Sequence, residues 1–160
     1  MDKNGCKNII VSTHDSLAPI TGGGALRTLK TAVEFKKRGH NVIIIAPTDE
    51  IGELHGIKTH WLHGPKKQRS AIFSSLKFNI RLLRKFLQFA GKTDIFFIHN
   101  TIATLFIPFL KLIFPVKFAL DITDIHAEYL PISQQSLFEK LMTPALLKIE
   151  YFIINSADTI

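Results

Sequence analysis

Two short runs of consecutive apolar residues constrain the fold of this chain more than any other feature. They are Asn8–Ser12 (NIIVS) and Val42–Ala46 (VIIIA), and Pro47 ends the second. Strands with one face in solvent alternate apolar and polar residues, whereas continuous apolar runs are typical of strands buried on both faces. Such strands occur in parallel sheets that helices cover on both sides. We therefore expect an α/β protein.

Helical and extended patterns alternate along the chain. Apolar residues at helical spacing from Leu26 predict a helix that ends at Gly39 after a basic last turn. Ile57–Leu62 alternates more strongly and is predicted to be a sheet-edge strand. The later expected elements are helices over 71–89, 102–114 and 137–155, strands over 95–98 and 116–122, and the start of a strand at 159–160. This order predicts a three-layer Rossmann-like domain with a mostly parallel sheet and helices on both faces.

Composition narrows the class of protein. The chain has 160 residues, of which 46% are hydrophobic and 21% charged, which fits one globular domain over 1–160. Its single cysteine, Cys6, cannot form an intramolecular disulfide, and no apolar leader follows Met1, so we expect a reducing cytoplasm. The apolar stretch 102–120 is too interrupted to span a membrane. Because the last residues enter a strand that they do not complete, we expect a truncated domain.

The formal net charge of +7 calls for an anionic partner if the charge is concentrated. Nucleic acid, anionic lipid and phosphorylated substrates are the candidates. No histidine pair has a metal-ligand spacing, and the acidic residues between Asp121 and Glu128 lie in one short segment without ligand geometry. We expect no metal site and no cofactor.

A run of three glycines, Gly22, Gly23 and Gly24, follows the first strand. In a doubly wound sheet, ligands collect at the carboxyl ends of strands, where helix N-termini offer free N–H groups to anions. The run does not match a dinucleotide fingerprint: nine residues separate Ser12 from Gly22, and Arg27 stands where a third glycine is required. No P-loop lysine follows either. The glycines form either an anion-binding loop or a flexible turn.

Four ordered segments resemble the N-terminal domain of family-4 glycosyltransferases of the GT-B fold. They are 19–24 (PITGGG) with 37–42 (KRGHNV), then 93–100 (TDIFFIHN), then 120–128 (LDITDIHAE), and finally Glu150 with 156–160 (SADTI). The resemblance extends over most of the chain. It implies a retaining transfer of sugar from a nucleotide-diphosphate sugar to a glycan or lipid-linked acceptor, as in polysaccharide biosynthesis. This chain would be the acceptor-side domain, inactive without an absent C-terminal donor-binding domain.

The resemblance also indicates site residues. Gly22, Gly23 and Gly24 would donate backbone N–H groups to the donor diphosphate or the acceptor. Asp124 aligns with a position near the acceptor and would orient or deprotonate its hydroxyl; the alternative is that Asp124 only caps the following segment. His99 and Asn100, at another strand end, would contact substrate or serve only as satisfied polar groups.

The helix predicted over 71–89 combines a broad apolar face with one basic face, formed by Lys77, Arg81, Arg84 and Lys85. This pattern is typical of a helix lying on anionic headgroups, and we expect a cytoplasmic protein peripheral to the inner face of the cell membrane. The alternative is a soluble helix whose apolar face packs on the sheet. Two other classes remain as alternatives for the whole chain, a basic module that binds nucleic acid or another anionic ligand and a small α/β binding domain without catalysis. Because the aromatic residues have the pattern of core or membrane-facing positions, where they could not stack on bases, we expect no nucleic-acid partner.

Overall fold

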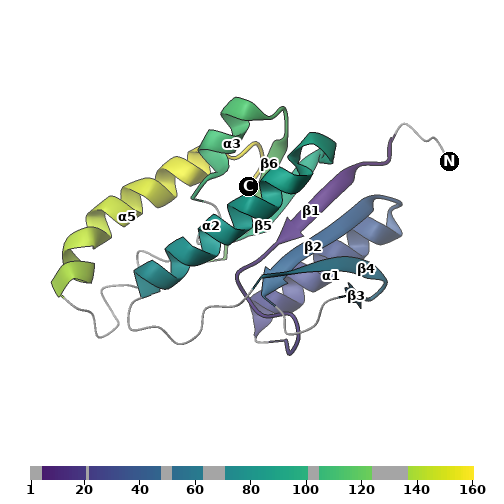
Figure 1. Ribbon diagram of the computed structural model, residues 1–160, viewed down its shortest axis with the longest axis horizontal. Coiled ribbons are helices and arrows are strands. Elements are labelled where there is room, and N and C mark those ends of the chain that lie inside the picture. Colours follow the sequence, from purple (N-terminus) through teal and green to yellow (C-terminus); the bar gives the residue numbers. More distant parts are fainter. Residues whose placement is uncertain (1–4, 21, 48–51, 63–70, 101–104, 124–136) are drawn as a thin grey trace.

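Six strands form one sheet in the order β3-β4-β2-β1-β5-β6 (Figure 1). The computed structural model describes residues 5–20, 22–47, 52–62, 71–100, 105–123 and 137–160, with only the backbone for 71–75, 107, 137–140 and 142. The strands are β1 (Asn8–Ser12), β2 (Asn41–Pro47), β3 (Gly52–Leu54), β4 (Ile57–Leu62), β5 (Ile95–His99) and β6 (Lys117–Asp121). All neighbouring strands are parallel except β3, which is antiparallel to β4.

The prediction that Ile57–Leu62 lies at the sheet edge is wrong. This strand, β4, pairs with β2 on one side and with β3 on the other, so β3 is the edge strand. His55 and Gly56 join β3 to β4 with φ angles of 51° and 70°. Positive φ at both central residues is the geometry of a tight two-residue hairpin. Because β3 has only three residues, its sequence carries too short a pattern to be recognised.

Helices cover both faces of the sheet, so the predicted three-layer α/β architecture is confirmed (Figure 1). The four α-helices of the described residues are α1 (Gly23–Lys37), α2 (Ala71–Phe89), α3 (Ile107–Ile113) and α5 (Leu137–Ser156), and a short 3-10 helix, η2 (Ala90–Lys92), follows α2. Within the described residues, the helix predicted over 102–114 is shorter than expected and begins at Ile107. Phe106 is its N-cap and Pro108 lies in its first turn, a position that favours proline because no helical N–H is lost there.

The alternation of side chains along each strand divides the core into two layers. Ile10 and Phe96 point to the face where Phe78, Phe86 and Ile153 of the helices α2 and α5 pack. The other face has its own cluster, which includes the following residues: Ile9, Val11, Ile44, Ala25, Leu29 and Ala32. Ala25, Leu29 and Ala32 all belong to α1. The central strands are therefore buried on both faces, as their continuous apolar runs predict.

Candidate functional site

The candidate site lies where β5 and β6 end beside the first turn of α1. His99 is the last residue of β5 and Asp121 the last of β6, and the two are register partners in the parallel pair. Phe97 lies two residues before His99 and packs in the core under α1. Side chains two residues apart on a strand point to the same face, and register partners do so as well, so His99 and Asp121 both point to the sheet face that α1 covers. Parallel pairing therefore brings together two polar residues that are 22 positions apart.

Asp121 connects the two strands to the helix. Its Oδ2 lies 3.1 Å from Nδ1 of His99, and its Oδ1 lies 2.6 Å from Nη2 of Arg27 in α1. The Asp121 side chain is 11% exposed and that of Arg27 is 57% exposed, so the guanidinium covers the carboxylate from the solvent side. This charged hydrogen bond joins the start of α1 to the end of β6.

His99 is buried, with 1% of its surface exposed, and its orientation follows from Asp121. A carboxylate only accepts hydrogen bonds, so the proton lies on Nδ1, and Nε2 faces the other way. There it meets Gly24: a Cβ built on this glycine would lie 2.7 Å from Nε2 and would also collide with Oδ2 of Asp15. The missing side chain of Gly24 is what lets the imidazole and the Asp15 carboxylate approach the helix.

The three glycines have three different surroundings. Gly22 has φ +119°, which side chains rarely adopt, and it is the N-cap of α1 without a side-chain cap. A Cβ on Gly23 would meet nothing within 4 Å, whereas Gly24 is closely packed. The first helical bond runs from the N–H of Leu26 to the carbonyl of Gly22, at 3.3 Å, so the N–H groups before Leu26 have no acceptor within the helix.

The loop between β1 and α1 is folded onto the sheet. Leu17, only 1% exposed, belongs to the core beneath α1, and its N–H donates to the carbonyl of Pro47 at 3.1 Å. Asp15 donates its N–H to the hydroxyl of Thr13 at 3.1 Å, and one of its carboxylate oxygens lies 3.3 Å from Nε2 of His14. The carboxylate of Asp15 is thus anchored beside Gly24.

Asn100 turns the chain as it leaves β5. It has φ 73°, a conformation that asparagine tolerates better than most residues. Its N–H donates to the carbonyl of Asp121 at 2.8 Å, and its side-chain amide donates to the hydroxyl of Thr123 at 3.5 Å. With 3% of its surface exposed, Asn100 holds the strand ends together.

The structure thus brings the predicted Gly24, His99 and Asn100 to one edge of the sheet, with Gly22 and Gly23 at the start of α1. Asp124 lies outside the described residues. Sequence reasoning missed the roles of Asp15, Arg27 and Asp121. The sequence offers a signal for two of these residues. Asp121 lies near the end of a predicted strand, as His99 does, and Arg27 occupies the position at which a dinucleotide site needs glycine.

The predicted basic residues of α2 lie on the opposite face of the sheet from this site. Lys77, Arg81 and Arg84 are exposed, while Lys85 is half-buried. Burial, together with the charges of Lys85 and Lys58, lowers the pKa of His60 in β4 below 6.5, which places Lys85 toward β4. None of the helices in the described ranges is long and apolar enough to cross a membrane.

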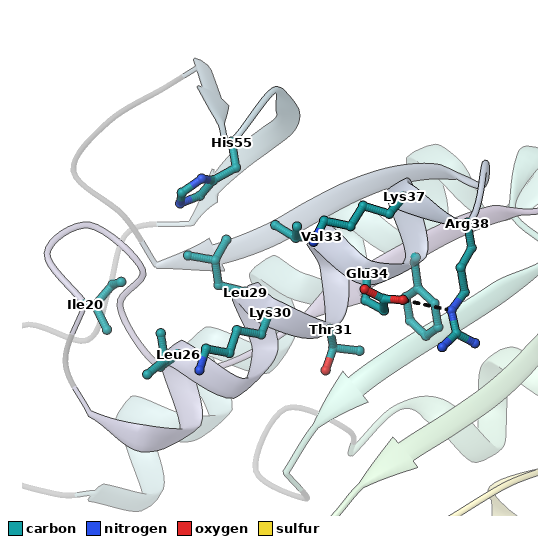
Figure 2. Close-up of a pocket in the computed structure, with 11 residues that line it drawn as sticks. Ile20, Leu26, Leu29, Lys30, Thr31, Val33, Glu34, Lys37, Arg38 and His55 are labelled. Carbon is teal, nitrogen blue, oxygen red and sulfur yellow. Dashed lines mark hydrogen bonds and ion pairs between the residues drawn. The ribbon is translucent and has the colours of Figure 1, made fainter.

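A shallow hollow of about 800 Å³ runs along the outer side of α1 and reaches the turn between β3 and β4 (Figure 2). Ile20, Leu26, Lys30 and His55 line it, among others, and Glu34 forms an ion pair with Arg38 at 3.2 Å beside it. His99 and Asp121 are not among its lining residues. It offers exposed apolar and charged side chains rather than buried polar groups that converge on a ligand.

No group of three histidine, cysteine, aspartate or glutamate side chains suited to a metal ion occurs in the part of the chain that the structure describes. The two carboxylates at the site lie beside side chains of this chain. Asp121 lies beside the guanidinium of Arg27, and Asp15 beside the imidazole of His14.

The sheet order, the two helical layers and the polar strand ends define an α/β domain that resembles part of a GT-B glycosyltransferase. The solved structure that shows this likeness is sucrose-phosphate synthase (tll1590) from Thermosynechococcus elongatus, with a TM-score of 0.62 over 88% of this chain and 11% sequence identity. The chain spans 40% of that protein's chain. The sequence itself matches no family model and no curated protein. At this identity the likeness shows the fold.

Proposed function

We propose that the chain is the acceptor-side domain of a retaining glycosyltransferase that uses a nucleotide-diphosphate sugar and works with a second, donor-binding domain. The observation that carries the proposal is the cluster of Gly24, His99 and Asp121 at the carboxyl ends of parallel strands, in a fold that resembles part of a GT-B glycosyltransferase. Ligands of open α/β sheets bind at this edge.

In the proposed reaction the bond between the sugar's anomeric carbon and the diphosphate breaks, and a bond to the acceptor oxygen forms on the same face. The acceptor's proton passes to the departing phosphate oxygen. The protein then has to position the reactants and stabilise the charge that develops on the diphosphate. The N–H groups at the start of α1 would donate to anionic oxygens, and Nε2 of His99 lies beside Gly24 in the same turn.

Asp121 is a positioning residue in this proposal, because it acts through His99 and Arg27. Asp124, only three residues further on, would orient the acceptor hydroxyl. The reaction as written moves one glycosyl group and one proton, and it calls on no cofactor.

A nucleic-acid-binding function is less well supported. Proteins that bind single strands stack bases on exposed aromatic side chains between basic residues. On the basic helix α2, Phe78 and Phe86 are buried in the core, and Phe89 is half-buried against His60.

The test is a transfer assay on the complete protein with a panel of UDP- and GDP-sugars, measuring release of the nucleoside diphosphate. We expect turnover with at least one donor, and we expect Asp121→Asn to lower kcat by roughly a hundredfold with a smaller change in KM, since positioning is lost. Replacing Glu34, an exposed carboxylate of α1 beside the hollow, by Gln is the matched control and keeps wild-type kcat.

Circular dichroism must show both variants folded. Neither transfer nor hydrolysis with any donor, or an Asp121→Asn variant as active as Glu34→Gln, would overturn the proposal.

A further inference from the structure

The hollow beside α1 gathers exposed apolar side chains on a part of the surface that is otherwise polar. Ile20 and Leu26 are 48% and 42% exposed, and both line the hollow. Within the described ranges, every other exposed large apolar side chain belongs to α2, α3 or α5, or is Ile160. Figure 2 shows Ile20 and Leu26 together with Leu29 at one end of the hollow. This end offers apolar contact to a ligand.

Four of the lining residues form one stripe along α1. They are Leu26, Lys30, Val33 and Lys37, whose spacing of four, three and four places them on one face of the helix. The stripe extends over roughly three helical turns. His55, in the turn between β3 and β4, lies across the hollow from it (Figure 2). The hollow is therefore elongated, and a second helix is the kind of ligand that fills such a groove.

The hairpin across the hollow is held against α1. The ammonium group of Lys36 donates a hydrogen bond to the carbonyl of Gly56 in the hairpin turn. Leu54 and Ile57, on either side of the turn, pack in the core under α1. Since neighbouring side chains on a strand point to opposite faces, Glu53 points to the other face of the sheet and away from the hollow. The described part of the hairpin thus adds no acidic side chain to it.

The charges that line the hollow are mainly basic. Lys30 and Lys37 are exposed, and in the described structure neither forms a hydrogen bond or an ion pair. Glu34 is the one acidic residue among the described lining residues, and it is already paired with Arg38 at 3.2 Å. Two lysines without a partner therefore alternate with the apolar residues of the stripe.

We propose that this hollow docks an acidic amphipathic helix of a partner protein. Its apolar side would pack on Leu26 and Val33, and its carboxylates would pair with Lys30 and Lys37. Charge selects this occupant, because a second copy of the same surface would bring lysine against lysine, whereas acidic side chains complement it. The inference goes beyond sugar transfer and does not depend on it.

A displayed library of random helix-forming peptides, selected on the immobilised full chain, tests the proposal without any activity measurement. We expect enrichment of peptides that combine an apolar stripe with flanking aspartate or glutamate. A selected peptide is then labelled and titrated by fluorescence anisotropy. It should bind a Lys30→Glu/Lys37→Glu variant roughly tenfold or more weakly than wild type. The matched control, Lys77→Glu/Arg84→Glu, makes the same charge change on exposed residues of α2 and keeps wild-type affinity.

A second variant, Ile20→Ser/Leu26→Ser, tests apolar contact separately from charge. Both side chains are exposed, so the fold is kept, as circular dichroism will verify, and we expect weaker peptide binding at unchanged net charge. Equal affinity of the two charge variants would overturn the proposal, as would a selection that enriches no acidic amphipathic peptide. So would flotation with anionic vesicles, or a dimer in light scattering, that only the Lys30/Lys37 variant loses, since the hollow would then bind lipid or a second copy.

Discussion

At the scale of single residues, the glycine run is three sites with different physical demands. Gly22 is required for its backbone angle, Gly24 for the space that its missing side chain leaves to His99 and Asp15, and Gly23 for neither. The sequence alone could not separate these roles, because all three are the same residue in one loop. The close approach at Gly24 depends on a histidine 75 positions further along the chain.

A pair of alanine substitutions tests this distinction. We expect Gly24→Ala to lower the free energy of unfolding by about 1–3 kcal/mol, because the new methyl group overlaps the imidazole and the carboxylate. Gly23→Ala is the control in the same turn. It should be neutral or stabilising by up to about 1 kcal/mol, because alanine restricts the unfolded chain. Urea denaturation measures both, and equal effects would contradict the close packing of Gly24.

At the scale of elements, α3 is attached to the chain end by a small polar clamp. Lys111 bonds to Asp158, and Asp158 also accepts the N–H of Phe118 in β6 at 2.8 Å. Burial raises the pKa of Asp158, but the hydrogen bonds from Lys111 and Phe118 outweigh it, so the pKa lies below 3.8. The clamp joins a seven-residue helix to the edge of the sheet.

The clamp predicts a pH-dependent contribution to stability. We expect Lys111→Met to lower the free energy of unfolding at pH 7 by about 1 kcal/mol, a small effect because both charges are partly exposed. Because the pKa of Asp158 is lower in the folded protein than in the unfolded chain, its ionised form stabilises the fold. This contribution is complete at pH values above the ordinary pKa of 3.8. The difference between wild type and Lys111→Met should therefore shrink as the pH falls below 3.8. Urea denaturation at several pH values measures it, and a constant difference would contradict the ion pair.

At the scale of the whole molecule, the two core layers share the same central strands. Ile10 and Ile45 face one layer, while Ile9, Val11 and Ile44 of the same strands face the other. Neither layer can lose its packing without exposing the strands on which the other depends.

We therefore expect a single cooperative unfolding transition. Far-UV circular dichroism follows the helices, which lie in both layers, and the fluorescence of Trp61, the one tryptophan of the chain, follows β4. The two signals should give the same urea midpoint. Separate midpoints would mean that the layers unfold independently.

The sequence by itself determined the class of fold and most of its elements. Val42–Ala46 has no polar side that could face water, and local apolar periodicity is enough to predict buried strands and the helices between them. Local periodicity did not predict β3, because three residues are too few to show a pattern.

Only the tertiary structure decided how the candidate site is assembled. The Asp121 carboxylate contacts His99 because parallel pairing aligns the ends of β5 and β6. It contacts Arg27 because α1 packs on the sheet face to which Asp121 points. The exposure of Leu112 likewise depends on the helices that pack around α3. Contacts between residues far apart in the chain depend on how whole elements pack, and local apolar periodicity does not predict that packing.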